Sequence, residues 1–227
     1  PDEGYLAKVK EIAHKHGAVL IFDEVVSGFR YALGGASELY NVVPDMASFG
    51  KGMGNGYAIS AVAGKKEILK LIEEGVFIST TFGGDAIPMA ASLATIKILE
   101  QPGYYEHIWK MGTMMKDGII SLIKKHNLEN VVSFSGLAPH CGLAFEGKEN
   151  LNYLDINSIY SQVMIDHGIL VLAICNLNKY HKEKEIQAYL DATEAAFSLI
   201  KTAIQKNSFE GILIGGKVDP VFKRNIK

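Results

Sequence analysis

A lysine set among glycines is the most unusual chemical feature of the sequence. Lys51 lies between Gly50 and Gly52, and two further glycines follow at positions 54 and 56. Glycines let the backbone take positive φ values and approach a bulky ligand closely. A lysine amine in such a segment could form an imine with a carbonyl compound. The other interpretation is a flexible surface hairpin that carries a solvated lysine.

A carboxylate follows the first apolar run of the chain. Residues 18–22 (AVLIF) are continuously apolar, which predicts a strand buried on both faces of a parallel sheet, and Asp23 comes directly after them. Open α/β sheets usually bind ligands at the carboxyl ends of their strands. Asp23 is therefore either a strand-end cap or a partner for a cationic ligand group. An imine-forming Lys51 and an Asp23 that pairs with a pyridinium nitrogen are the two protein groups that pyridoxal 5'-phosphate chemistry needs.

The elements that must position Asp23 and Lys51 alternate between helix and strand. Apolar periodicity predicts helices over residues 4–17, 65–74 and 86–99, and short apolar runs predict strands over 46–49 and 59–63. The helix over 86–99 carries one apolar face, formed by Met89, Leu93, Ile96 and Leu99. This first part of the chain, residues 1–102, is predicted to be the end of an α/β domain with a connecting helix.

The pattern changes beyond Gly103 to longer helices with fewer glycines. Helices are predicted over 104–126, 156–167 and 183–205, and strands over 131–134, 141–145 and 169–174. Asp155 is the expected N-cap of the middle helix, and Gly168 is expected to end it. Residues 103–227 are therefore predicted to form a small α+β domain with an irregular tail from Ser208.

The composition excludes several classes of protein. The 227 residues are 48% hydrophobic and carry 23 Lys and Arg against 25 Asp and Glu, so the formal charge of -2 offers no basic field for nucleic acid or an anionic membrane. No apolar run approaches the roughly 18 residues that span a bilayer. Cys141 and Cys175 cannot form a disulfide framework, which favours a cytoplasmic location. His14 and His16 face different sides of a helix, and no spacing predicts a metal site.

Three ordered segments resemble the class III, fold-type I family of pyridoxal-phosphate-dependent aminotransferases. Residues 20–30 (LIFDEVVSGFR) resemble its cofactor-binding strand, residues 44–52 (PDMASFGKG) its Schiff-base lysine segment, and residues 79–90 its phosphate-touching loop and connecting helix. Residues 28–30 (GFR) and 176–181 (NLNKYH) are similar to the glutamate-1-semialdehyde 2,1-aminomutase branch. Members are longer than this chain, which resembles their C-terminal part: the end of a mostly parallel large domain and a small α+β domain.

The resemblance implies a role for each of four residues. Lys51 would bind the cofactor aldehyde and then move a proton between substrate and cofactor, and Asp23 would bond the protonated pyridine nitrogen. Val25 would pack on one face of the ring, although it could also be an ordinary core valine. Thr81 would contact the cofactor phosphate across a homodimer interface, or it would stabilise a tight turn before the glycines that follow. Asp85 stands where asparagine is common in the family, so either its charge points away from the phosphate or the loop differs from that of the family.

The resemblance implies pyridoxal-phosphate-dependent amino-group transfer on a small-molecule substrate, by an aminotransferase or by an aminomutase. The alternative is a truncated, non-catalytic relative that acts as a structural or dimerisation module, since the relatives' own-subunit phosphate loop lies upstream of Pro1. A fold-type I decarboxylase would share the aspartate and the lysine but fits the class III segments less well. Arginine occurs only at positions 30 and 224, so the later half shows no obvious arginine for a substrate carboxylate.

Overall fold

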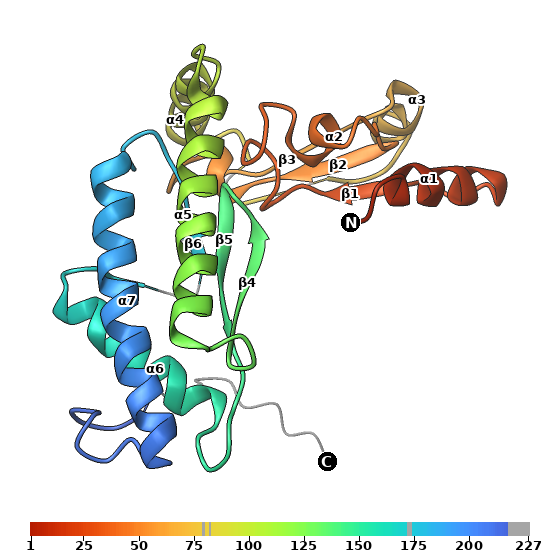
Figure 1. Ribbon diagram of the computed structural model, residues 1–227. Coiled ribbons are helices and arrows are strands. Elements are labelled where there is room, and N and C mark those ends of the chain that lie inside the picture. The colour runs from red at the N-terminus through yellow and green to blue at the C-terminus, as the bar shows by residue number, and fades with distance from the viewer. Residues whose placement is uncertain (79, 82, 172–173, 218–227) are drawn as a thin grey trace. The chain divides into compact units, whose positions relative to one another are not determined.

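The computed structural model describes residues 1–78, 80–81, 83–171 and 174–217, which form two compact units (Figure 1). The first unit extends to Tyr105 and the second begins at Glu106, so the division falls within the first turn of helix α5 (Tyr104–His126). Within these described ranges, no helix combines the length and the apolar composition that a bilayer span requires.

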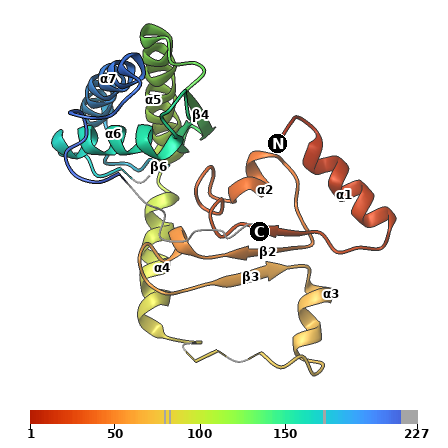
Figure 2. The same ribbon diagram turned by 90° about the horizontal axis from the view of Figure 1, so that it is seen from below.

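The first unit is built on a three-stranded sheet in the order β1–β2–β3 (Figure 2). Strand β1 (Ile21–Asp23) pairs in parallel with β2 (Met46–Phe49), and β2 pairs antiparallel with β3 (Ala61–Gly64). Because β1 and β2 are parallel, their carboxyl ends meet at the same edge of the sheet. The chain segments that follow Asp23 and Phe49 therefore begin side by side.

Short helices fill the connections of this unit. They are α1 (Tyr5–Lys15), α2 (Gly35–Leu39), α3 (Lys66–Leu69), α4 (Ala86–Leu99) and the 3-10 helices η1 (Lys51–Met53) and η2 (Lys70–Ile72). The predictions of α1 and α4 are confirmed. The single helix predicted over 65–74 is instead an α-helical turn followed by a 3-10 turn, and the sequence did not predict α2 or η1.

The apolar side chains of the first unit are more exposed than the sequence predicts. Residues 18–22 were predicted to be buried on both faces, whereas Val19 is 52% exposed and Ile21 is 59% exposed. On α4, the predicted apolar face includes Leu93, which is 62% exposed. Helix α1 buries none of its residues, and the buried apolar side chains in the described part of this unit are few: Val42, Ala47, Met53 and Leu99.

The second unit combines three helices with an antiparallel sheet in the order β4–β5–β6 (Figure 1). Its strands are β4 (Val132–Leu137), β5 (His140–Phe145) and β6 (Ile174–Asn176), and α5 is joined by α6 (Tyr153–Asp166) and α7 (Glu183–Lys206). Fully buried side chains of α6 and α7 form much of the core, including Ile156, Ile159, Met164, Phe197 and Ile200.

The predicted strand over 169–174 is largely wrong. Residues 169–171 are not in a strand, residues 172–173 lie outside the described residues, and β6 begins only at Ile174. A short apolar run without alternation does not by itself separate a strand from other buried or extended chain. The long helices carry a stronger signal, and the predicted ranges 104–126 and 183–205 agree with α5 and α7.

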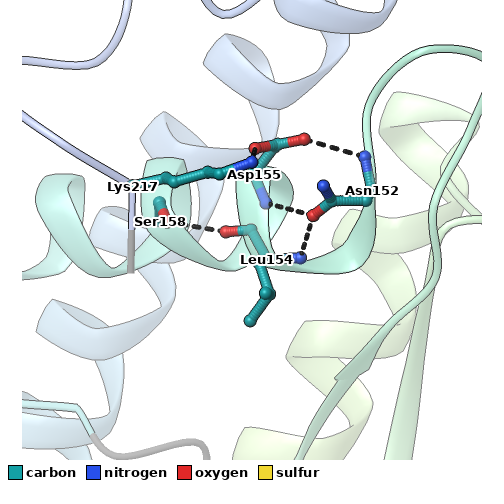
Figure 3. A network of polar contacts seen from close by, with 5 residues as sticks. All are labelled: Asn152, Leu154, Asp155, Ser158 and Lys217. Carbon is teal, nitrogen blue, oxygen red and sulfur yellow. Dashed lines mark hydrogen bonds and ion pairs between the residues drawn. The ribbon is translucent and has the colours of Figure 1, made fainter. Parts of the chain in front are cut away.

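The N-cap of α6 is Asn152 rather than the predicted Asp155 (Figure 3). Asn152 Oδ1 accepts hydrogen bonds from the backbone N–H groups of Leu154 (2.9 Å) and Asp155 (3.1 Å). Asp155 reaches back, so that its Oδ2 accepts from the Asn152 N–H at 2.9 Å and completes a capping box. Its Oδ1 lies 3.5 Å from Lys217 Nζ. Gly168, at φ 75°, ends this helix as predicted.

Two glycines within α5 lie where other chain segments come close. A Cβ on Gly112 would overlap the backbone carbonyl of Ala138, whereas a Cβ on Gly118 would lie 2.5 Å from a methyl carbon of Leu190. A carbonyl in a turn moves less easily than the end of a leucine side chain. These close approaches account for two residues that weaken the helical pattern of the sequence.

We expect Gly112→Ala to lower the free energy of unfolding by about 1–3 kcal/mol, because the added methyl group overpacks against backbone. Gly118→Ala should leave that free energy unchanged or raise it by up to about 1 kcal/mol, because alanine favours the helix and Leu190 can move. Chemical denaturation followed by circular dichroism measures both variants. Equal losses in the two would contradict the close approach at Gly112.

Candidate functional site

The carboxyl ends of β1 and β2 bring Asp23 and Lys51 to one edge of the sheet. Asp23 is the last residue of β1 and lies opposite Ser48 in the register of the parallel pair. Lys51 follows β2 by two residues and opens η1. The prediction that Asp23 stands at the carboxyl end of its strand is confirmed.

One oxygen of the exposed Asp23 carboxylate is held by the protein. Its Oδ1 accepts hydrogen bonds from the Val25 N–H at 3.1 Å and from the Ser48 hydroxyl at 3.2 Å. Within the described residues, Oδ2 accepts no hydrogen bond. Asp23 can therefore act both as a strand-end cap, through Oδ1, and as a partner for a ligand, through Oδ2.

Lys51 turns the chain sharply after β2. Its φ of 41° lies in the left-handed region, which is uncommon and strained for a residue with a side chain. The Met53 N–H donates to the Gly50 carbonyl at 2.9 Å, and Met53 is buried, so this segment is a 3-10 turn and not the surface hairpin of the alternative interpretation. The Lys51 side chain is exposed, and Nζ has no hydrogen bond or ion pair with another described residue.

Val25 lies beside the backbone that leads into Lys51. A Cβ on Gly50 would be 3.6 Å from Val25 Cγ1 and 3.9 Å from Val25 Cγ2, which is ordinary van der Waals contact. Val25 is half-buried, so part of its surface remains open at this edge of the sheet. Asp23, Val25 and Lys51 are thus gathered at the carboxyl ends of β1 and β2.

The structure does not bring Thr81 to this group of residues. Thr81 is exposed in a turn in which the Gly83 N–H donates to the Thr80 carbonyl at 3.3 Å, and in the described chain it makes no hydrogen bond with Asp23 or Lys51. The turn leads into α4, which lies against η1. Asp85 caps α4, because its Oδ1 accepts from the Ile87 N–H at 3.1 Å.

A buried carboxylate that sequence reasoning missed joins the opposite end of the sheet. Asp45 is 4% exposed, and its Oδ2 accepts from the Leu20 N–H at 2.7 Å and lies 2.9 Å from His14 Nε2. Its Oδ1 lies 2.7 Å from Lys65 Nζ. The hydrogen bonds from Lys65, Leu20 and His14, in that order of size, hold the pKa of the Asp45 carboxyl well below its ordinary value of 3.8.

Asp45 therefore joins α1, the start of β1, the start of β2 and the end of β3. The sequence signals only a polar residue after Pro44, because the partners of Asp45 come from segments that are distant along the chain. His14 is thereby explained as a partner of Asp45. In the part of the chain that the structure describes, no group of three or more His, Cys, Asp or Glu side chains could hold a metal ion.

Comparison with known proteins identifies the family of the chain. The model of the family described as aminotransferase class-III matches residues 1–180 of this chain. The chain belongs to the class-III aminotransferase family. Glutamate-1-semialdehyde 2,1-aminomutase 2 of Brevibacillus brevis is 35% identical over an alignment of 180 residues, and the match covers 75% of this chain and 42% of that protein.

Several solved structures share the fold of this chain. The FumI protein of Sphingopyxis sp. MTA144, solved in its PLP internal aldimine form, matches with a TM-score of 0.79 and 24% identity, over 90% of this chain and 48% of its own. A transaminase with PLP bound matches with a TM-score of 0.82 and 20% identity, over 90% of this chain and 49% of its own. The chain thus spans less than half the length of these relatives, and its α/β fold is part of theirs.

We expect the first unit to lose stability in acid through Asp45. The pKa of Asp45 is lower in the folded than in the unfolded chain, so its ionised form stabilises the fold. This contribution to the free energy of unfolding is present above about pH 4 and is lost as the pH falls below that value and the carboxyl takes up a proton. Asp45→Asn should lower the unfolding midpoint at neutral pH and flatten its dependence on pH below 4.

Thermal unfolding of the two proteins between about pH 2 and pH 7 tests this expectation. Asp2→Asn is the matched control, since Asp2 is an exposed carboxylate of the same unit. An Asp45→Asn protein with the acid dependence of the wild type would contradict the assignment.

Proposed function

We propose that this chain carries the lysine and the ring-nitrogen partner of a pyridoxal 5'-phosphate site that serves amino-group transfer. The observation that carries the proposal is the position of Asp23 and Lys51 at the carboxyl ends of two paired parallel strands. Membership of the class-III aminotransferase family supports it, as do the related structures that hold PLP.

The side chains at this edge fit the cofactor. Lys51 offers an exposed amine that no other described residue engages, Asp23 offers one open carboxylate oxygen, and Val25 offers an apolar surface between them. An aldehyde, a protonated ring nitrogen and a flat ring are the groups of pyridoxal phosphate that match these three. When bound, the cofactor supplies an electron sink for negative charge on the substrate carbon that bears the amino group.

Lys51 has two tasks in this proposal. Its Nζ would condense with the cofactor aldehyde, with loss of water, and so keep the ring in the site between turnovers. After an incoming amine took the place of Nζ, the free Lys51 amine would accept the proton from the substrate carbon and deliver it to C4' of the cofactor. The strained turn at Lys51 projects the amine from the end of β2.

Asp23 would keep the ring nitrogen protonated. Its Oδ2 would accept a hydrogen bond from the ring N–H, and its negative charge would stabilise the positive ring. Ser48 and the Val25 N–H hold Oδ1 and so limit rotation of the carboxylate. This arrangement orients the acceptor before the cofactor arrives.

The remaining parts of the proposal concern the assembly and the substrate. Thr81 supplies a phosphate contact across the interface of a cytoplasmic homodimer, and the capping bond of Asp85 turns that carboxylate toward α4. The substrate is a small molecule with an amino group. The identity to the Brevibacillus brevis protein supports 2,1-aminomutase chemistry, and the match to a transaminase with PLP bound supports transfer between two molecules.

We expect pyridoxal phosphate added to the chain to attach to Lys51. Reduction with borohydride should fix the cofactor to that side chain, and peptide mass spectrometry should find the added mass on the peptide that contains Lys51. Lys51→Ala should abolish this label and the absorbance band of lysine-bound cofactor.

Lys66→Ala, which removes an exposed lysine of α3, should retain both signals. A wild-type chain without the label, or a label that persists in Lys51→Ala, would overturn the catalytic proposal. Either result would favour the non-catalytic structural module.

We expect Asp23→Ala to weaken turnover more than it weakens cofactor retention. Loss of the charged hydrogen bond leaves the ring nitrogen unprotonated, so kcat/KM for amino transfer should fall by about a hundredfold or more, while the cofactor Kd rises by about tenfold or less. Glu67→Gln, on the exposed surface of α3, is the control. An equal loss of turnover and of binding would mean that Asp23 only retains the cofactor.

A further inference from the structure

Glu24 is a buried carboxylate with four hydrogen-bond donors around it. It is 1% exposed, although it directly follows the exposed Asp23. Its Oε2 accepts from the Ser27 hydroxyl at 2.5 Å and from the Ala36 N–H at 2.9 Å. Its Oε1 accepts from both the N–H and the hydroxyl of Ser37 at 2.8 Å. A single side chain thus fastens the first turn of α2 to the end of β1.

The backbone closes tightly around this carboxylate. The Gly28 N–H donates to the Glu24 carbonyl at 2.8 Å. Gly35 has a φ of 66°, and a Cβ there would lie 2.5 Å from Glu24 Oε2 and 2.9 Å from Gly28 Cα. Position 35 therefore requires glycine both for its conformation and for the space that the carboxylate occupies.

Glu24 is bonded to the groups that hold Asp23. The Glu24 N–H donates to the Ser48 carbonyl at 2.9 Å, and the hydroxyl of the same Ser48 donates to Asp23 Oδ1. The other donor to Asp23 Oδ1 is the N–H of Val25, the residue that follows Glu24. A displacement of Glu24 therefore moves both of the donors that orient Asp23.

The segment that Glu24 anchors also reaches the strand of the lysine. The ring of Phe29 lies 5.8 Å from the ring of Phe49, the last residue of β2. The Phe29 carbonyl accepts a hydrogen bond from the Tyr105 hydroxyl at 3.2 Å. Burial raises the pKa of Tyr105, so its hydroxyl stays protonated and remains a donor.

We propose that Glu24 is a positioning residue, which ties α2 to the end of β1 and, through Val25 and Ser48, keeps the open oxygen of Asp23 directed at the cofactor ring nitrogen. Only one part of this inference rests on the proposed function, namely that Asp23 Oδ2 is directed at the ring nitrogen. The anchoring of α2 by Glu24 is a property of the chain without cofactor, so the two parts are tested separately.

Hydrogen exchange of the chain without cofactor tests the anchoring. In Glu24→Ala, the amides of Ala36 and Ser37 should exchange about tenfold faster or more than in the wild type, since their buried acceptor is gone. Glu24→Gln should show a smaller increase in exchange rate. The oxygen of the glutamine side chain can still accept from Ser37, but its NH2 group would face the Ala36 N–H, and two donors cannot bond to each other. Gly35→Ala should also speed the exchange of these two amides. The added methyl group leaves the Glu24 carboxylate in the chain but pushes α2 away from it.

Glu38→Gln is the matched control. Glu38 lies in α2, and its Oε2 accepts from the Gly34 N–H at 2.7 Å without contacting Asp23 or Glu24. It should leave the exchange of Ala36 and Ser37 unchanged. Exchange in Glu24→Ala that equals the wild type at these two amides would overturn the anchoring.

Protonation of the ring nitrogen tests the positioning. With cofactor labelled by ¹⁵N in the ring, the wild type and Glu38→Gln should show the chemical shift of a protonated nitrogen at neutral pH. At cofactor concentrations that saturate the site, Glu24→Gln should lose part of this signal and Glu24→Ala should lose all of it. A merely structural role of Glu24 would change how much cofactor binds and would leave the shift unchanged.

The outcomes separate this inference from the proposed function. Failure of the wild type to bind cofactor overturns the proposed function and, with it, the role of Glu24 toward the ring. Binding by the wild type with an unaltered ¹⁵N shift in both Glu24 variants overturns the positioning role alone. Binding with the graded loss of protonation supports both.

Discussion

The parallel pairing of β1 and β2 is the constraint on which the site depends. It joins only a few residues on each strand, yet its register sets Asp23 opposite Ser48 and puts Lys51 just beyond the end of β2. A slip of one residue would turn Asp23 to the other face of the sheet and separate it from the Ser48 hydroxyl. The chemistry that we propose therefore requires that this short pair of strands be held in one register.

Two buried carboxylates hold the pair, one at each end. Asp45 binds the Leu20 N–H and Lys65 where the two strands begin, and Glu24 binds the first turn of α2 where they end. Neither side chain is available to a ligand, and each lies next to elements that carry the site. In a unit whose sheet is largely exposed, these two polar networks tie segments that are distant along the chain to the strand ends.

The sequence predicted the position of Asp23 at the end of its strand better than it predicted the residues that support this edge of the sheet. Lys51 and Asp23 were found because their signals are local: glycines around one residue and an apolar run before the other. Glu24 and Asp45 were missed because their burial depends on partners such as Ser37 and His14, which lie far from them along the chain. Ser48 was missed as well, because the ends of the two predicted strands do not reveal the register that sets Asp23 opposite Ser48.

The same distinction applies to the fold. Long periodic helices such as α5 and α7 were predicted nearly to the residue, because many turns carry the signal. The N-cap of α6 was misplaced, since Asn152 and Asp155 are both good capping residues and only the geometry shows which one caps. The burial of residues 18–22 was overestimated, because an apolar run indicates what could be covered and not what covers it.

A crystal structure of the chain soaked with pyridoxal phosphate tests most directly whether the edge formed by β1 and β2 is the cofactor site. We predict continuous density from Lys51 Nζ to the cofactor, with Asp23 Oδ2 within hydrogen-bond distance of the ring nitrogen and Val25 against the ring. Cofactor bound to a different lysine, or a ring nitrogen remote from Asp23, would contradict this assignment.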